Sequence, residues 1–524
     1  MSDASPKKTP PSCEELTARL KQAETRILEL ERLLMHYLAK DRSHLTARHE
    51  LEQGQPLLDL ATGHEPATSA AAEEDDDEDD PPPPYAPPRP QNGRRGRRKL
   101  PAHLPRETKD YEVNPEEDLP DYDPAEGYQI IDHDTCEELV LPRVEPKVIV
   151  HKRPVVLYQT RDGEARVTTA GGMSKVFPKC AASPEVLARI AVDRLHYHLT
   201  LYRIERWFAE LGCPLARSTL CNWMQWLGKL LQPLAKAQEL ELQSACNRHA
   251  DDTEVRVQAP GVCDQVRVWT VLGEVAEGGQ EVIFKYTETR TSATAQAVLG
   301  QHAGYLQVDA CNAYDGLYVA NPKLIEVGCW SHVFRKFEDL APVDRRAKPM
   351  LGLIRNMYAA DSWGAELAPE ERRIFRNLAV RPWLQRIGNW VTAQQQAEML
   401  ESSFKKALNY VSNQWAALKR FLEDGRLSLD NNVAEGEFHV LGVGRRNYLF
   451  WGSRDGLASG LVLFGLIRSC VANGLDPYQY LVDVIKRVAT TDLPAKQLIP
   501  SRWKQLPPLR SKVPALAGAA AESG

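Results

Sequence analysis

The chain has 524 residues, of which 43% are hydrophobic and 26% are charged, and its formal net charge is −6. This length leaves room for about three or four domains of ~150 residues each. No run of about 18 apolar residues occurs, and the polar start Met1–Pro11 is not followed by an apolar core, so we expect neither a membrane span nor a secretory signal. The 10 cysteines include no pair at C-x-x-C spacing. We therefore expect a cytoplasmic protein with reduced thiols, and neither a disulfide framework nor an ordinary zinc ribbon.

The charge is unevenly distributed along the chain. Residues 1–146 carry a net charge of −15 and residues 147–524 carry +9, which together make the −6 of the whole chain. A basic body behind acidic N-terminal segments suits a polyanion partner, with which the acidic segments would compete. Ordinary solvated surface charge would give the same pattern, so both interpretations stay open.

Heptad spacing predicts a coiled coil over residues 12–50. Ser12 and Glu15 have the spacing of a capping box. Apolar residues then recur at two heptad positions, with Leu20, Ile27 and Leu34 at one and Leu16, Ala23, Leu30 and Tyr37 at the other. A single amphipathic helix packed on its own chain would show the same pattern.

Residues 51–106 have the composition of a disordered linker. They contain the acidic run Glu73–Asp80 and the proline run Pro81–Pro84, and such a segment buries too little apolar area to fold alone. A basic cluster follows, and it either contacts phosphates or keeps the linker solvated. Its members are Arg94, Arg95, Arg97, Arg98 and Lys99.

A small β module is predicted for residues 107–180. Four short apolar runs are separated by prolines and by an Asp-Gly turn at Asp162. These predicted strands are Tyr128–Ile131, Lys147–His151, Val155–Tyr158 and Ala165–Thr169.

Residues 183–245 show helical periodicity in three segments. The first opens at Ser183, the second covers Leu199–Leu211 and stops at Gly212, and the third is expected to start at Ser218 as its cap. This order matches a helix-turn-helix, in which the last helix enters a major groove. Any small helical bundle has the same outline.

From residue 246 to 340 the pattern changes to strands with intervening helices, which predicts a mixed sheet. The expected strands are His249–Val257, Val266–Val271, Val282–Tyr286, Tyr305–Val308 and Leu324–Cys329. Helices are expected over Ser292–His302 and from Ser331 onward.

Three acidic residues occupy positions suited to chemistry. Asp251 lies on the first strand, Asp309 follows the fourth, and Glu435 comes just after Asp430–Asn432, where the side chains of Asp430 and Asn431 can cap a helix. Carboxylates from two strands and a helix could converge on a pair of Mg²⁺ ions, which take oxygen ligands and catalyse phosphoryl transfer. Because the chain has 71 acidic residues, chance alignment would also explain this set.

Other polar residues nearby are interpreted more simply. Asp252 and Glu254 are expected to face solvent. Cys329 and His332 are two metal-ligand types three residues apart, but without a second pair they predict a buried thiol beside a hydrogen-bonded histidine.

At these positions the sequence resembles the DDE transposases of the insertion sequence 66 family. The similarity covers most of residues 13–490 and is strongest in five ordered motifs. The motifs are His249–Thr253, Gly304–Ala310, Gly328–His332 with Arg335–Phe337, Asp430–Glu435 with Gly444–Ser453, and Asn473–Leu481.

The resemblance implies an α/β catalytic core with an RNase H-like mixed sheet that is interrupted by an all-α insertion. The core would occupy 246–340 and 429–470, the insertion 341–428, and a C-terminal helical segment 471–524. Asp251, Asp309 and Glu435 would bind Mg²⁺ or Mn²⁺ for cleavage and joining of DNA ends. The partners would be terminal inverted repeats and target DNA, and the protein would be a homo-oligomer, with a dimer favoured. A need for accessory proteins of the same element stays open.

Basic residues within these motifs and in the helical region are the expected DNA contacts, together with the basic cluster of the linker. They are Arg217, Ser218, Arg335, Lys336, Arg445 and Arg446.

The sequence departs from the family pattern in two places. Asp118–Gly127 and Tyr158–Gly163 carry no cysteine where the family has a zinc-binding module, so no zinc is expected. Gly436 and His439 stand where the family has arginines near the catalytic glutamate. These departures leave two other hypotheses, a DNA-binding remnant that no longer cuts and an assembly factor that acts through its coiled coil.

Overall fold

The computed structural model describes residues 145–508, apart from 153–154, 160–164, 170–174, 178–179, 277, 301, 310–313 and 398–401. The predicted coiled coil (12–50) and the linker with its basic cluster (51–106) lie outside these residues. The predicted strand Tyr128–Ile131 and the stretch Asp118–Gly127 also lie outside them. Those expectations stay predictions.

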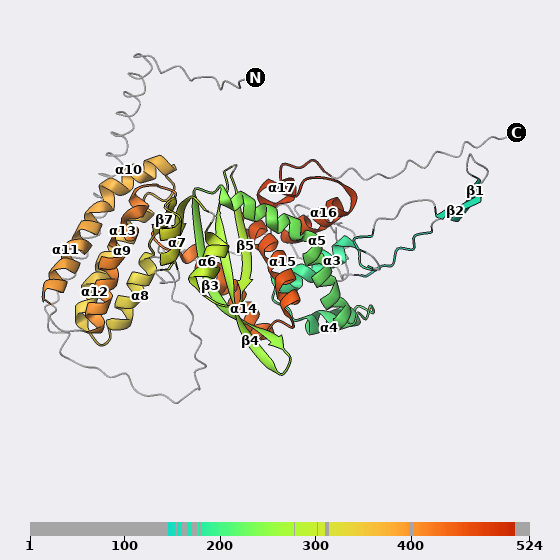
Figure 1. The fold of residues 1–524 in the computed structure, drawn as a ribbon, viewed down its shortest axis with the longest axis horizontal. Helices are drawn as coiled ribbons and strands as arrows, with labels where there is room; N and C mark the ends of the chain where they lie inside the picture. Colours follow the sequence, from blue (N-terminus) through green and yellow to red (C-terminus); the bar gives the residue numbers. More distant parts are fainter. Residues whose placement is uncertain are drawn as a thin grey trace, which may run out of the picture.

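A mixed five-stranded sheet forms the centre of the protein, as the sequence predicted (Figure 1). Its order is β5-β4-β3-β6-β7, with β3, β4 and β5 antiparallel and with β6 and β7 parallel to β3. All five strands were predicted, but β3 and β4 extend further, into a long hairpin whose turn uses Gly261 at φ 75°. The bounds are β3 Asn247–Ala259, β4 Val262–Glu274, β5 Gln280–Thr287, β6 Gly304–Gln307 and β7 Leu324–Val327.

Helices cover both faces of this sheet because successive strand residues point to opposite sides. Along β4, Val266 and Val268 belong to the core shared with α5 (Arg217–Gln243) and α15 (Arg454–Ala472). Trp269 and Val271 belong to a second core, which is shared with helices of the opposite face. Those helices are α6 (Ser292–Leu299) and α7 (Asp315–Ala320).

Helix α15 is the central helix of the first core. By length and composition it could cross a membrane, but 61% of its apolar window is buried inside the protein. Its Phe464 ring lies 4.6 Å from that of Phe284 on β5. It also approaches α5 so closely that a Cβ on Gly228 would lie 2.5 Å from Ser459. These contacts are those of a core helix.

Three helices precede the sheet, as predicted. Ser183 caps α3 (Pro184–Leu195) and Thr200 caps α4 (Leu201–Glu210), each through its side-chain oxygen. The third helix, α5, begins at Arg217 and has no side-chain cap, so the predicted start and cap at Ser218 were wrong. The physical reason is that the Arg217 N–H donates to the Glu205 carboxylate at 3.0 Å, which satisfies a free donor of the first turn.

Helix α5 continues for 27 residues into the body of the protein. Its apolar face packs on α15, and α16 (Pro477–Thr490) packs on α3. The short helices α17 (Ala495–Leu498) and α18 (Pro500–Trp503) complete this side. The three N-terminal helices are therefore built into the sheet's core.

A separate helical core lies beyond β7, at the left of Figure 1. Its centre contains Trp330, Phe337 and Phe404, whose rings meet edge to face with neighbouring aromatic rings. Buried Arg376 pairs with Asp361 at 2.6 Å and donates to the carbonyls of Phe421 and Leu427. The helices are α8 (Trp330–Leu340), α9 (Lys348–Ser362), α10 (Pro369–Ala379), α11 (Arg381–Ala397), α12 (Ser403–Asn413) and α13 (Trp415–Lys419).

The predicted β module is only partly present among the described residues. β1 (Val155–Gln159) and β2 (Ala165–Thr169) form the predicted antiparallel hairpin. Lys147–His151 was predicted as a strand, and this was wrong. These residues are exposed, Val148 to 89%, and they pair with no described strand. An extended segment without a neighbouring strand gains no hydrogen bonds of a sheet.

Candidate active site

A buried asparagine joins the candidate site's three sequence motifs. Asn431 is fully buried, and its Oδ1 lies 3.1 Å from Nδ1 of His249. Its Nδ2 donates to the carbonyl of Ala250 at 2.9 Å, and its backbone N–H donates to Cys329 Sγ at 3.2 Å. Burial lowers the pKa of His249 to about 4, so the neutral ring can donate from Nδ1. One residue, through its side chain and its backbone, thus holds its own motif against those of His249 and Cys329.

This role replaces the cap that we predicted for Asn431. Helix α14 (Asn432–Tyr448) receives no cap bond from the Asn431 side chain. Asp430 serves in its place, because its Oδ1 accepts from the Asn432 N–H at 3.1 Å while its Oδ2 accepts from Tyr358 at 2.8 Å.

Asp251 follows this junction on β3. Its Oδ1 accepts from the Asp252 N–H at 2.8 Å. Burial raises the pKa of Asp251 to about 8, and the carboxylates of Asp309 and Glu435 add to the rise by repulsion. The site therefore brings Asp309 and Glu435 close enough to disfavour the ionised form of Asp251.

Arg290, in the connection between β5 and α6, pairs with both Asp309 and Asp252. Arg290 donates to both oxygens of Asp309, at 3.3 and 3.2 Å, and its Nε lies 2.8 Å from Asp252. Burial lowers the pKa of Arg290, but these carboxylates outweigh it and leave the pKa above its usual range. The prediction that Asp252 faces solvent was wrong, since its side chain is 0% exposed and also pairs with Arg267. Glu254 is 49% exposed, as expected.

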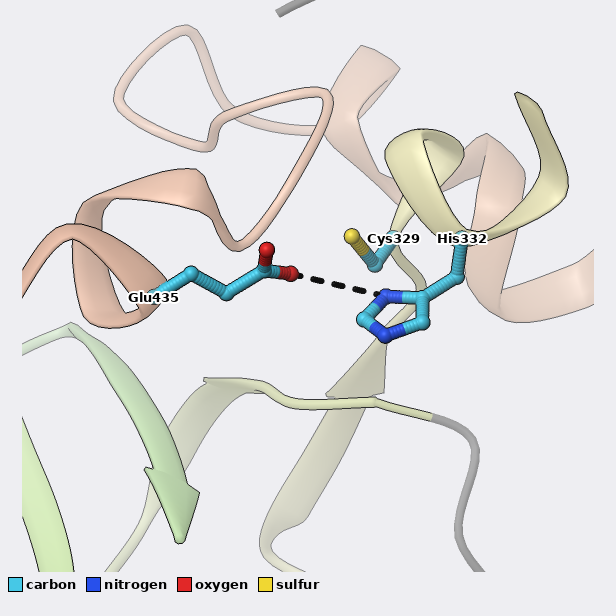
Figure 2. A group of neighbouring side chains, drawn as sticks. All are labelled: Cys329, His332 and Glu435. Carbon is cyan, nitrogen blue, oxygen red and sulfur yellow. Dashed lines mark ion pairs between the residues drawn. The ribbon is translucent and has the colours of Figure 1, made fainter. Parts of the chain in front are cut away.

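Glu435 lies in the first turn of α14 and faces α8 (Figure 2). Arg335 of α8 forms an ion pair with its Oε2, and His332 Nδ1 lies 3.7 Å from its Oε1. Burial lowers the pKa of His332. Nδ1 of His332 has no hydrogen-bond partner among the described residues, so the expected hydrogen bond of this histidine is not made at Nδ1.

Figure 2 also shows Cys329 beside this pair. Cys329, His332 and Glu435 offer ligand atoms within 4.8 Å of one another. The thiol is buried, as predicted, and lies 2.9 Å from Ser331 Oγ, and burial raises its pKa to about 12. The Asn431 N–H also donates to this sulfur, so the Cys329 thiol takes part in the buried junction around Asn431.

A groove of about 910 Å³ starts at these acids and follows α14 and the β3–β4 hairpin. At one end lie Asp251, His332 and Glu435, and at the other Leu449 and Phe450. Asp309 is not among the lining residues and lies behind them with Arg290. The groove wall includes Asp252, Arg335, His439, Arg445 and Arg446.

The expected DNA contacts fall into two groups. Arg335, Arg445 and Arg446 line the groove. Lys336 lies on α8 with its Nζ 4.5 Å from the Tyr410 ring centroid. The other group, Arg217 and Ser218, does not line the groove. Both residues lie at the exposed start of α5, where Arg217 pairs with Glu205 at 3.6 Å.

Comparison with known sequences identifies the family. The sequence model described as "Transposase IS66 family" matches residues 179–459, more than half of the chain. The chain belongs to the IS66 transposase family. The match includes all three acids and ends within α15.

Relatives from Sinorhizobium fredii extend the similarity. The chain is 29% identical over 352 residues to "Uncharacterized protein y4hP", and this aligned region covers 63% of each chain. It is 28% identical over 382 residues to "Uncharacterized protein y4qI", which covers 69% of each. The match thus spans less than two thirds of the first relative's length.

The two residues that stand in place of the family's arginines lie on the exposed side of α14. Gly436 and His439 are both exposed, and His439 lines the groove. A Cβ on Gly436 would meet nothing within 4 Å. An arginine at 436 would therefore fit without displacing the backbone.

Sequence reasoning missed Arg290 and the full role of Asn431. Arg290 lies outside every motif used, in a connection whose direction depends on how β5 and α6 pack. The only available signal for Asn431 was its place beside Asp430, which also suggested a cap.

We predict that Asn431→Ala lowers the free energy of unfolding by about 2–4 kcal/mol, because it leaves the buried His249 ring and the Ala250 carbonyl without partners, at ~1–3 kcal/mol each. Urea denaturation followed by circular dichroism measures this. The matched control is Asn432→Ala, since Asn432 Oδ1 accepts no hydrogen bond, and we expect a change below about 1 kcal/mol. Equal effects of the two substitutions would refute the junction.

We predict that Asp251→Asn stabilises the metal-free protein in a pH-dependent way. Because the folded pKa of about 8 exceeds the ordinary 3.8, the wild type loses stability as pH rises from about 4 to 8. The amide avoids this loss. Since the side chain keeps some solvent contact, we expect a gain of roughly 2 kcal/mol near pH 8 that shrinks toward pH 5.

Thermal unfolding at several pH values in chelator measures the effect. Glu254→Gln on the same strand is the control and should show no such trend. A gain that does not change with pH would contradict the assignment.

Proposed function

We propose that this protein is a DDE transposase that cleaves and joins the DNA ends of an insertion sequence with a divalent metal. The proposal is supported by the charges of Asp309 and Glu435, which act on the buried Asp251 although the three acids belong to separate motifs. It is also supported by the family to which the chain belongs, since these acids stand where the sequence resembles the DDE motifs. The strand order with three antiparallel and two parallel strands supports an RNase H-like core. Glycosyl or acyl transfer would not need three such acids beside arginines.

The residues present fit a hard divalent cation. All three side chains offer carboxylate oxygens, which Mg²⁺ and Mn²⁺ prefer. Glu435 Oε1 has no hydrogen-bond partner among the described residues, and the pKa of Asp251 is raised partly by uncompensated negative charge. When bound, the metal would supply Lewis-acid stabilisation of the attacking and leaving oxygens.

The chain's own arginines position these acids. Arg290 fixes both oxygens of Asp309, and Arg335 fixes Glu435. A guanidinium that can pair with carboxylate can also pair with phosphate, because its planar fork fits both groups. Arg335 lines the groove, so it is placed to exchange Glu435 for a DNA phosphate.

DNA is the proposed partner on the same grounds. The groove wall carries Arg445 and Arg446, and phosphate contacts account for most of the affinity of such surfaces. Assembly as a homo-oligomer and a place on the bacterial nucleoid are proposed from the resemblance alone, and a need for accessory proteins stays open.

The alternative is a DNA-binding remnant, and the observation in its favour is the loss of arginine at positions 436 and 439. Against it, Arg335 already supplies a cation to Glu435. Arg335 of α8 thus places a positive charge beside Glu435, as an arginine on α14 would, and this favours the active enzyme.

We predict metal-dependent nicking at the inverted repeats that border the gene. Wild type should cut a duplex of that sequence with Mg²⁺ or Mn²⁺. Asp309→Ala and Glu435→Ala should each lower cutting by at least about 10³-fold, because each removes a metal ligand. Gel analysis of end-labelled DNA measures the products, and unfolding curves verify that each variant is folded. Cutting by folded Asp309→Ala would refute the proposal.

We predict that the double substitution Gly436→Arg, His439→Arg tightens binding of the same duplex. The slope of log K against log salt concentration should become steeper by about one or two, because each arginine adds a phosphate contact. Cutting should persist. Gly352→Arg is the matched control, since Gly352 is also an open helical glycine but lies on α9. A wild type that binds without cutting, together with a double variant that cuts, would establish the remnant.

A further inference from the structure

The far end of the groove carries exposed apolar side chains. Leu449 is 67% exposed and Phe450 is 44% exposed, although both line the same groove as the acids. From Glu435 to Leu449 the chain follows α14, which spans about 20 Å at 1.5 Å per residue. That distance equals about six base-pair steps of 3.4 Å.

The backbone at this tip is strained. Leu449 adopts φ 57° and ψ −42°, and the Phe450 N–H donates to the Tyr448 carbonyl at 2.5 Å. This is a γ-turn with positive φ, a rare conformation for a residue with a Cβ. Such strain persists only where the surroundings impose it, and it concentrates at functional positions.

The surroundings hold the tip from both sides. Trp451 donates its N–H to the Arg256 carbonyl and accepts from the Gln258 N–H, each at 2.8 Å, which bridges it to β3. The Tyr448 and Trp451 rings meet edge to face at 5.6 Å, and the Arg194 guanidinium lies 3.8 Å from the Tyr448 ring centroid. The turn is therefore fixed, while the two side chains between its anchors project outward.

The charge beside the tip indicates which partner fits it. Arg445 and Arg446 precede it on α14, and Arg256 faces it from β3, all lining the groove. Arg445 is held along β3 by Thr253 Oγ1 at 3.2 Å and by the Glu254 carbonyl. Guanidinium groups beside apolar side chains match a nucleic acid, which offers phosphates and base faces together.

We propose that Leu449 and Phe450 form an apolar wedge that enters the DNA between two base pairs, about six steps from the phosphate that is cut, and unstacks them. This rests on the proposed function, because it takes DNA ends as the ligand of the groove. Phe and Leu wedges kink DNA, and the unstacking cost is offset by the contacts that a bent duplex gains. The wedge would hold the duplex in a fixed register relative to Asp251, Asp309 and Glu435.

The test uses duplexes of the bordering inverted repeat with 2-aminopurine placed singly at steps three to nine from the cut site. Full-length protein binds them in chelator, where no cutting occurs. We expect fluorescence to rise severalfold at one or two adjacent positions near step six.

The wedge variant is Leu449→Gly with Phe450→Ala, because glycine adopts positive φ without strain and keeps the turn. We expect it to abolish the fluorescence rise and to weaken binding about 5- to 30-fold, in line with the loss of base stacking at one or two side chains. Phe450→Trp should retain the rise. Val343→Ala is the control, since Val343 is 84% exposed outside the groove lining, and it should change neither measurement.

Bound DNA without a fluorescence rise at any position would overturn the wedge and leave the proposed function intact. A rise that persists in the folded wedge variant would overturn it as well. Absence of binding by wild type to the inverted repeat would instead count against the proposed function itself.

Discussion

The contacts of Asn431 are the constraint on which the site depends. Its side chain reaches His249 and Ala250, and its backbone reaches Cys329; His249 and Cys329 lie 182 and 102 residues from it in the chain. A buried polar junction of this kind is stable only when every partner is satisfied, because each unpaired group would carry its full desolvation cost. The start of α14, the acid-bearing part of β3 and the end of the β7–α8 connection are thereby fixed together.

Once these segments are fixed, electrostatics determines how the acids can lie. Three carboxylates cannot stay close without cations, and the protein supplies arginines at two of them, Arg290 at Asp309 and Arg335 at Glu435. Asp251 has no arginine partner among the described ion pairs, and burial together with the neighbouring carboxylates raises its pKa. Each of the other two acids is held by its own arginine.

The long β3–β4 hairpin and α14 extend the site into a groove. The wall that faces α14 is formed by β3 from Asp251 to Arg256 and by Cys263 and Gln265 of β4. The observed strands continue beyond the predicted ones to Ala259 and Val262. The bridge between Val257 and Trp451 ties the far end of α14 to that extension. Asp251, Glu435 and the strained turn at Leu449 therefore line one continuous groove.

The sequence alone predicted the five strands, their neighbouring helices and the three acids, because alternation of apolar residues, a helix start such as Ser183 and short motifs are local signals. It could not show that Asp252 is buried, that Arg290 bridges two acids or that Asn431 is a junction. Each of these depends on residues that become neighbours only when the parallel strands and α14 pack together. Local pattern determined the elements and the acidic groups, whereas tertiary packing alone decided which charges neutralise which, since electrostatic partners follow distance in space and not distance along the chain.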